Sequence, residues 1–507
     1  MGRETLRALM LSDKNYIVRI LSLKTIRDIF FVIKNKIKYG DRLEVVFGDI
    51  RSSSDCERLV KGADYVQHLA AIIPPTADHR LQETIEVNYD GTVNLVNAVK
   101  KEESLGKTLS FVHISTVALY GERNLEHPWG RVGDPVIPSV FDVYAQSKAS
   151  AERYVLESGL KKWMVLRQSG ILYPSLLIDN VSDGLMFHTC WNTPIEWSSD
   201  VDCGTLMKNI VDYDLDKKKG GWYGVYNIGG GAPMRTTGYG TFDHGFKLIG
   251  GSAESFFMPY YNKDRNFHCI WYLDSQKLED LYHFRRTSFD DFWRIVKKKY
   301  PFFSLARLLP AKLIKALVVD PLRRTSNAPE YWIKHRIDAK VIANFKDGYD
   351  SMNRKKSWEN QPVLDKNLVT EDGYGEKEFL DEDGAISRGL SLDIGYDADK
   401  NVDDFTIDDI KKIAEFRGGR CLSDSFLGAD DRLTFECSEG HRFETTLRVL
   451  LAGFWCPECQ RIGVWNYDKL AKSSPFYSVW YDSHSTDEDN YYYLDDKYQP
   501  LYRKLEK

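Results

Sequence analysis

A tyrosine and a lysine stand four residues apart in the stretch DVYAQSKASAERY (142–154), at Tyr144 and Lys148. Residues four apart in a helix lie on one face, so the phenol and the ammonium would be neighbours. A free tyrosine titrates at about pH 10, and a nearby ammonium stabilises the phenolate and lowers that pKa. Thr116, at the end of an earlier apolar run, adds a hydroxyl that can hydrogen-bond both the phenol and a substrate oxygen. The trio predicts proton transfer at a carbinol or carbonyl oxygen while a nicotinamide exchanges hydride with its carbon.

A second group of chemically capable residues lies near the other end of the chain. Cys437, His441, Cys456 and Cys459 follow the spacing C-x3-H-x14-C-x2-C. Two closely spaced pairs of thiolate and imidazole ligands suit a closed tetrahedral zinc site. The nearby Cys421 is expected to be a buried spare rather than a ligand.

The elements that must position Thr116, Tyr144 and Lys148 alternate along residues 1–175. Alternating strand and helix patterns predict an α/β fold with a doubly wound, parallel Rossmann-type sheet. Ligands of such sheets bind beyond the carboxyl ends of the strands, where the polar residues of this chain gather. The expected strands are 16–23, 43–50, 65–71, 109–121 and 163–174, and the expected helices include 54–62, 86–103 and 145–159.

The rest of the chain divides by composition. We expect a dinucleotide-binding domain, a substrate-binding subdomain with a return to the sheet near 222–231, an acidic linker, a zinc-binding module and an aromatic-acidic tail. Their ranges are 1–175, 176–345, 346–404, 405–461 and 462–507. A basic amphipathic stretch at 296–324, interrupted by prolines, is expected to cap the substrate pocket or pack on the core. The alternative for this stretch is contact with an anionic membrane.

Composition narrows the class of protein. The 507 residues carry a net charge of −5 and are 43% hydrophobic, which gives no global reason to expect nucleic acid as a partner. No apolar run is long enough to span a membrane, so a membrane is not expected as a partner either. The cysteines cluster rather than form a disulfide framework, which favours a reducing compartment and a cytoplasmic location.

Several ordered motifs of residues 2–250 resemble the extended short-chain dehydrogenase/reductase family of NAD-dependent epimerases and dehydratases. The matching stretches are GDI, HLAA, VNYDGT, ISTVALYG, YAQSK, LRQSGILYP and YNIGGG. The resemblance implies that Thr116, Tyr144 and Lys148 are catalytic. It implies that the cofactor is bound by Asp49, Ile50, Leu69, Ala70, Ala71, Asn88, Tyr144 and Lys148.

One departure from this family concerns the start of the chain. The family opens with a strand and a G-x-x-G-x-x-G loop that holds the pyrophosphate at a helix N-terminus. This sequence opens with MGRETLRALM, which resembles the helix after that loop, with Gly2 as its last glycine. We therefore expect the chain to be truncated relative to a longer natural sequence.

Other residues narrow the chemistry. Val117 and Ala118 occupy the positions where the family's sugar-nucleotide dehydratases carry Asp-Glu, so dehydration is not expected. Ser22 and Lys24 close the strand 16–23 without the carboxylate that bonds a ribose hydroxyl of NAD, which slightly favours NADP over NAD.

The stretch 420–460 resembles small treble-clef-like zinc modules that accompany phage and endonuclease proteins. Residues 411–461 contain eight basic and eight acidic residues, so they lack the basic footprint of a DNA-binding finger. A structural or protein-contact role is the better expectation for this module.

The sequence thus predicts an NAD(P)-dependent oxidoreductase or epimerase that acts on a sugar nucleotide or similar hydroxylated small molecule, with Zn²⁺ in its C-terminal part. A homodimer is compatible with the sequence. The alternative is a non-catalytic nucleotide-sensing or scaffold protein with a zinc-held interaction module.

Overall fold

The computed structural model describes residues 1–123, 127–139, 141–179, 184–351, 356–360, 391–460 and 467–488. Most of the expected acidic linker, and the end of the expected tail, lie outside these residues. Among the helices that the structure describes, none has the length and hydropathy needed to cross a bilayer.

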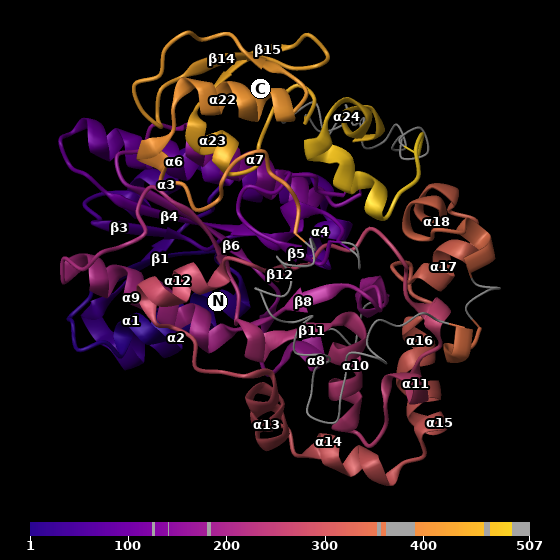
Figure 1. Cartoon of the computed structure of the whole chain (residues 1–507). Helices are drawn as coiled ribbons and strands as arrows, with labels where there is room; N and C mark the ends of the chain where they lie inside the picture. The colour runs from indigo at the N-terminus through magenta and orange to yellow at the C-terminus, as the bar shows by residue number, and fades with distance from the viewer. Residues whose placement is uncertain are drawn as a thin grey trace.

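A parallel sheet forms the centre of the first domain (Figure 1). Four strands lie in the order β10-β6-β4-β3, and a separate parallel pair joins β1 to β2. Among the described strands, β1 pairs only with β2 and β3 only with β4, so the sheet consists of two parallel blocks. The bounds are β1 Val18–Ser22, β2 Leu43–Phe47, β3 Tyr65–His68, β4 Ser110–Thr116, β6 Trp163–Gln168 and β10 Val225–Ile228. The expected Rossmann-type α/β fold is confirmed, with strands shorter than expected.

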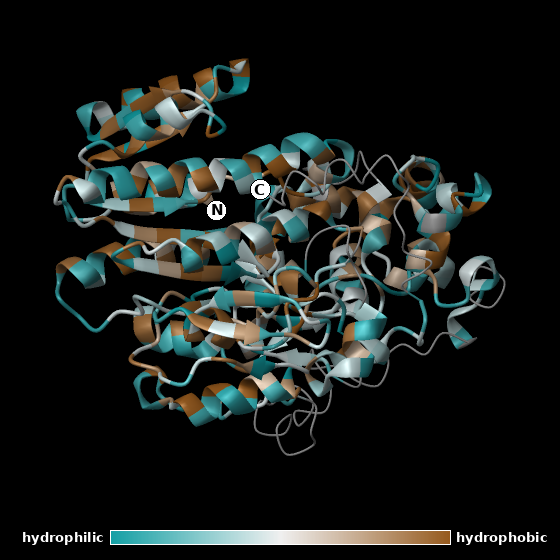
Figure 2. Cartoon of the chain, turned by 90° about the horizontal axis from the view of Figure 1, so that it is seen from above, coloured by the Kyte–Doolittle hydropathy of each residue, from teal (hydrophilic) through white to brown (hydrophobic). Residues whose placement is uncertain are grey.

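Helices cover both faces of this sheet because successive strand residues point to opposite sides. Phe111 of β4 packs in one apolar cluster with residues of α6 and α7, whereas the adjacent Val112 packs with residues of α9 and α12 on the other face. Helix α1 packs along α9. The helices of Figure 2 carry both teal and brown segments, as amphipathic helices do. Their bounds are α1 Gly2–Met10, α2 Ile26–Tyr39, α3 Ser53–Val60, α6 Gly91–Ser104, α7 Val143–Glu157, α9 Asp200–Leu215 and α12 Ser275–Tyr282.

Most of the region expected to bind substrate, with α8, α10, α11 and α13 to α15, forms the lower part of Figure 1. Its aromatic residues build a core in which Trp191 contacts Phe242, Phe257 and Trp358. Short strands pair here as β11-β8, β12-β5 and β7-β9. The strands are β5 Trp129–Gly130, β7 Ile171–Leu172, β8 Pro194–Glu196, β9 Ser198–Ser199, β11 Arg235–Thr237 and β12 Trp271–Tyr272. The remaining helices of residues 1–345 are α4 Thr76–His79 and α5 Leu81–Ile85, which contact α7, and α8 Leu176–Asp179, α10 Gly238–Lys247, α11 Ala253–Phe256, α13 Phe289–Lys299, α14 Phe302–Leu305, α15 Ala311–Ile314, α16 Asp320–Leu322, α17 Pro329–Lys334 and α18 Asp338–Asn344.

The third part, residues 405–460, is called the Cys/His unit below. Its strands form an antiparallel sheet in the order β13-β14-β15. Val449, Ala452 and Phe454 of this unit belong to the same apolar cluster as Phe111 and Val165 of the central sheet. The unit is therefore part of the body of the molecule and lies over α7 in Figure 1. Its elements and those that follow are α22 Ile407–Phe416, β13 Arg420–Cys421, β14 Leu433–Glu436, β15 Arg442–Thr445, α23 Leu447–Leu451, α24 Tyr467–Ser473 and the 3-10 turn η13 Pro475–Asp482.

Candidate active site and candidate metal centre

Thr116 and Tyr144 meet at the carboxyl end of the central sheet. Thr116 is the last residue of β4, and Tyr144 lies in the first turn of α7. Asp142 caps this helix by accepting a hydrogen bond from the backbone N–H of Ala145 at 2.9 Å. The hydroxyl of Thr116 accepts a hydrogen bond from the backbone N–H of Ala118 at 3.1 Å, and its interaction with the phenol of Tyr144 acts to lower the pKa of that phenol. A phenol and a hydroxyl are thus held together at the edge where parallel sheets bind ligands.

Lys148 lies one helical turn further on and is 2% exposed. Its Nζ lies 3.4 Å from Nε2 of His113, which is its only hydrogen-bond partner among the described residues. Burial lowers the pKa of Lys148 to about 7, and the nearby charge of Glu152 opposes this shift.

The expected effect of Lys148 on Tyr144 is absent from this structure. Burial raises the pKa of Tyr144 to about 12, while the hydrogen bond with Thr116 works in the opposite direction. The expectation of a lowered phenol pKa is therefore wrong for the chain alone. The physical reason is that the Lys148 amine points to the sheet and His113, and that low-dielectric surroundings penalise the phenolate.

A pH-dependent stability follows from the buried Lys148. Between about pH 7 and 10.5 the unfolded chain binds a proton at this amine that the folded chain does not bind. The free energy of unfolding should therefore rise with pH in this window, by up to about 1.4 kcal/mol per pH unit. Urea unfolding of the wild type and of Lys148→Met at several pH values measures this slope, which the variant should lack. Lys101→Met, at an exposed lysine, is the control and should keep it; equal slopes in wild type and Lys148→Met would contradict the prediction.

A buried charged network behind α7 was missed by the sequence analysis. Glu152 forms an ion pair with Arg167 at 2.6 Å, both side chains being inaccessible, and accepts a hydrogen bond from Ser115 at 2.5 Å. Arg167 also donates to Tyr120 at 2.8 Å. The signal was present in the sequence, since Glu152 follows Lys148 by one helical turn. This network fixes α7 to β4 and β6.

His113 and His68 were likewise missed. They are register partners on the adjacent strands β3 and β4, with ring centroids 5.2 Å apart. His68 Nε2 lies 2.8 Å from the hydroxyl of Thr92. Burial lowers the pKa of His68 to about 3 and that of His113 well below its ordinary value, so both rings are neutral.

Asn88 ties the strand-end loop to α7. Its side chain accepts a hydrogen bond from the Ile72 N–H at 2.8 Å and donates to the Ile72 carbonyl at 3.0 Å and to the Ser147 hydroxyl at 3.2 Å. Asn88 sits in a π-helical turn, η2 (Glu86–Asp90), that continues into α6. The structure therefore brings Asn88 against the helix of Tyr144, and its contacts are those of a positioning residue.

The other residues expected to bind a cofactor lie at the ends of β2 and β3. The carboxylate of Asp49 pairs with Arg51 at 2.6 Å, and Ile50 is buried against Gly91. Leu69, Ala70 and Ala71 follow β3 directly, and Ala70 is exposed. These residues thus border the same edge of the sheet as Thr116, although the Asp49 carboxylate already has a cationic partner.

The four predicted metal ligands converge in the Cys/His unit. One ligand atom from each of Cys437, His441, Cys456 and Cys459 lies within 4.8 Å of the others. The Sγ atoms of Cys437 and Cys459 are 3.7 Å apart, and Nδ1 of His441 lies 3.3 Å from Sγ of Cys459. Zinc–sulfur bonds of about 2.3 Å in a tetrahedron separate the sulfurs by roughly 3.8 Å, so the spacing fits one zinc ion. Gly440, with φ +79°, makes the turn that brings His441 back to Cys437.

The Cys/His unit contacts the helix and loop that present Tyr144. Arg153 of α7 donates to the Trp455 carbonyl at 2.8 Å, and Arg167 donates to the Ala452 carbonyl at 2.5 Å. Gly453, with φ +89°, approaches the loop before α7 so closely that a Cβ there would lie 2.0 Å from the Asp134 carbonyl oxygen. Gln460 donates to the Val136 carbonyl in the same loop at 3.0 Å. Four polar and backbone contacts thus join the candidate metal centre to the approach to the active site.

Residues 1–166 match the family model described as the NAD dependent epimerase/dehydratase family. The match covers β1 to β4, α7 and most of β6, and so includes Thr116, Tyr144 and Lys148. It supports the family assignment for this part of the chain.

The chain also matches named relatives over part of its length. It is 32% identical over 142 residues to a 3 beta-hydroxysteroid dehydrogenase/Delta 5-->4-isomerase of Mycobacterium tuberculosis, covering 26% of this chain and 36% of the relative. It is 30% identical over 142 residues to a 3-beta-hydroxysteroid dehydrogenase of Mycolicibacterium neoaurum, with the same coverage. The chain thus spans about a third of the length of the curated relatives it matches.

Solved structures with NAD resemble the chain at low identity. A dTDP-glucose 4,6-dehydratase from Bacillus anthracis gives a TM-score of 0.45 at 20% identity, covering 60% of this chain and 94% of that one. A UDP-glucuronic acid 4-epimerase from Bacillus cereus gives 0.43 at 21% identity, covering 60% and 95%.

Proposed function

We propose that this protein is an NAD(P)-dependent oxidoreductase that interconverts a secondary alcohol and a ketone on a hydroxylated small molecule. The observation that carries the proposal is the placement of Thr116 at the carboxyl end of β4 and of Tyr144 in the first turn of α7, with the Lys148 amine one turn along the same helix. The family match of residues 1–166 supports the same chemistry.

Each residue of the trio has a separate role in this proposal. Thr116 holds the reacting oxygen of the substrate, and Tyr144 exchanges a proton with that oxygen. Lys148 donates hydrogen bonds to ribose hydroxyls. A nicotinamide dinucleotide, when bound, supplies or accepts the hydride at the substrate carbon.

The raised pKa of Tyr144 favours one direction of reaction. With a pKa of about 12 the phenol is protonated at neutral pH, so it is ready to donate its proton to a carbonyl oxygen. Carbonyl reduction therefore needs no prior change in the chain, whereas alcohol oxidation needs the phenol to lose its proton first. We propose that the chain alone is in the protonation state from which carbonyl reduction starts.

The residues around Lys148 fit a ribose. An amine with three donor positions has only one described partner, at 3.4 Å, and Nδ1 of His113 beside it is buried without a hydrogen bond. Buried polar atoms that lack hydrogen-bond partners in the protein can form hydrogen bonds with hydroxyl groups of a ligand. Lys24 lies just beyond the end of β1 and is exposed, which supports a preference for NADP over NAD through its charge.

Titration of the chain with NADPH and NADH, followed by nicotinamide fluorescence, tests the cofactor. Both should bind, NADPH more tightly, and Lys24→Glu should reverse that preference by about tenfold because it removes a phosphate-binding charge and adds a repulsive one. Lys101→Glu, at another exposed lysine, should leave the preference unchanged. If neither NADPH nor NADH binds, the proposal is contradicted.

Two substrate classes compete for the same chemistry. The hydroxysteroid names of the curated relatives support a steroid-like alcohol. The motifs of residues 2–250 favour a sugar nucleotide as the substrate. A panel of ketosteroids and keto-sugar nucleotides, followed through consumption of NADPH, separates the two.

We further propose that Cys437, His441, Cys456 and Cys459 bind one structural zinc ion. Four ligand atoms at tetrahedral spacing leave no coordination position for water or substrate, so the zinc would be structural rather than catalytic. The contacts of Ala452, Gly453 and Trp455 support a role in holding α7 and the loop before it. A purely scaffolding protein would bind zinc and dinucleotide without turnover. Measuring both NADPH affinity and NADPH-dependent reduction distinguishes it from an enzyme.

A further inference from the structure

Helices α13, α14 and α15 form the lower end of the molecule in Figure 1 and carry exposed apolar side chains. Large hydrophobic side chains in this segment are unusually accessible: Leu308 is 82% exposed and Leu305 is 65% exposed. We call this surface the 294–319 face. Its exposed apolar residues are Ile295, Phe302, Leu305, Leu308, Leu309, Leu313, Leu317 and Val318. Single exposed apolar residues are ordinary, whereas eight within one short segment indicate a contact surface.

The opposite side of the same segment anchors it to the body. Phe292 and Val296 of α13 are buried in one apolar cluster, and Ile314 and Val319 are buried in another. Arg307 donates hydrogen bonds to the backbone carbonyls of Leu248 and Lys247. The exposed face therefore belongs to helices whose other side is anchored to the body of the molecule. The expectation that the segment packs on the core is met on one side only.

The charge of the face has a single sign. Residues 294–319 contain seven lysines and arginines and no acidic residue. Lys297, Lys298 and Lys312 are exposed, and Lys298 forms no ion pair with a described residue. Apolar side chains mixed with cations, of which Arg294 alone is paired with a described carboxylate, complement an interface that is anionic outside and apolar beneath.

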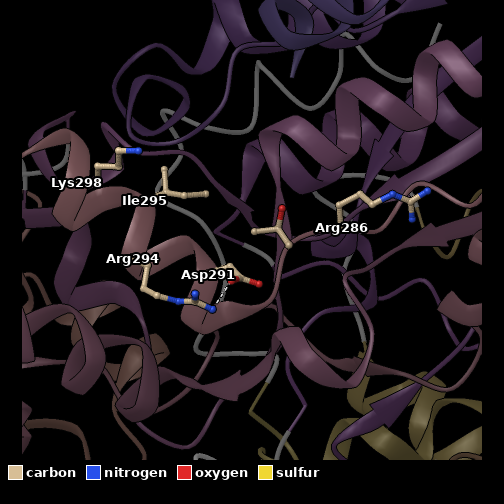
Figure 3. Close-up of a pocket in the computed structure, with 6 residues that line it drawn as sticks. Arg286, Asp291, Arg294, Ile295 and Lys298 are labelled. Atoms are coloured by element: carbon tan, nitrogen blue, oxygen red, sulfur yellow. Dashed lines mark hydrogen bonds and ion pairs between the residues drawn. The ribbon is translucent and has the colours of Figure 1, made fainter.

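A hollow of about 360 Å³ adjoins this face between α13 and the segment before it (Figure 3). Ile295 and Lys298 of α13 lie on one side of the hollow and Arg286 on the other. The only carboxylate among its lining residues, Asp291, is paired with Arg294. The lining thus carries a net positive charge, which suits an anionic headgroup. The hollow is not lined by Thr116, Tyr144 or Lys148.

We propose that the 294–319 face binds the surface of a bilayer containing anionic lipids. Leu305, Leu308 and Leu317 enter the boundary between headgroups and acyl chains, while the lysines contact the phosphate and carboxylate groups. The segment consists of short helical pieces, so it lies on the membrane and does not span it. This inference does not depend on the proposed enzymatic activity.

Flotation of the purified chain with vesicles tests the proposal. Binding is expected to vesicles of phosphatidylcholine mixed with phosphatidylserine, to fall with added salt, and to be weak with phosphatidylcholine alone. Leu308→Glu should weaken binding about tenfold or more, because it removes an exposed leucine that would enter the membrane and adds a charge that anionic lipids repel. Leu427→Glu is the matched control, since Leu427 is 92% exposed on the Cys/His unit at the other end of the molecule.

Three results would overturn the proposal. The first is no binding to either kind of vesicle. The second is equal binding by Leu308→Glu and Leu427→Glu. The third is self-association of the wild type that Leu308→Glu abolishes, without vesicle binding, which would assign the face to a second copy of the chain. Because both variants change exposed residues, unfolding is checked by circular dichroism, and Lys298→Gln offers a second variant that should weaken binding in a salt-dependent manner.

Discussion

Replacing Tyr144 with phenylalanine is expected to lower kcat by about a thousandfold, the scale of a lost general acid. The variant removes one oxygen and keeps the ring, so the packing of α7 stays intact. The variant loses the phenol proton and the interaction of the phenol with Thr116. The measurement is NADPH-dependent reduction of the best substrate from the panel, together with NADPH affinity.

Tyr154→Phe is the matched control for this experiment. Tyr154 lies on the same helix, and its hydroxyl donates to the Asn97 side chain at 3.0 Å on the exposed side. This control should keep both activity and stability. Unchanged turnover in Tyr144→Phe would contradict the catalytic role. Dinucleotide binding by the wild type without turnover of any ketone would favour the scaffold alternative instead.

The loss of the zinc site is expected to have the second large effect. The wild type should contain one zinc ion per chain, and Cys456→Ser should lose it and be destabilised by more than about 4 kcal/mol. Cys456 is fully buried, so the empty site leaves thiols and an imidazole crowded without the ion that brings them together. Metal analysis and thermal unfolding measure both effects.

Cys421→Ser is the matched control because Cys421 lies in the same unit, is half-buried and is absent from the four-ligand cluster. It should keep its zinc and its stability. If Cys456→Ser does not fold, removal of zinc from the wild type by a chelator tests the same point, and adding zinc back should restore the melting temperature. A Cys456→Ser variant with full zinc content would refute the ligand assignment.

The zinc experiment also tests the link to the active site. Arg153 and Arg167 donate to carbonyls of the Cys/His unit, and Gly453 lies against the loop that leads into α7. Loss of zinc should therefore lower activity along with stability. If a chain that has lost its zinc keeps its activity, the Cys/His unit does not support the active site.

Local sequence patterns were enough to predict the helices and strands, and to predict which reactive side chains within a short stretch lie close together. The alternation of apolar runs and helix patterns predicted the parallel sheet, and each predicted strand contains an observed one. The spacing of Cys437, His441, Cys456 and Cys459 predicted a cluster that the fold brings together. Such predictions succeed because spacing along a helix, strand or tight turn fixes which side chains share a face.

Tertiary structure alone decided the environment of each group. The amine of Lys148 was expected beside the phenol, but the fold buries it against His113, a residue 35 positions away on another strand. Burial then raises the pKa of Tyr144 and lowers that of Lys148. The spacing of residues along the chain does not predict how strongly a side chain is buried, and burial sets the local dielectric. The sequence likewise separated the Cys/His unit as a module, whereas the fold places Val449 and Phe454 in the core of the first domain. Residue types and local spacing therefore determined which groups this protein has for chemistry. Long-range packing determined their charge states and contacts, because burial depends on segments distant in the chain.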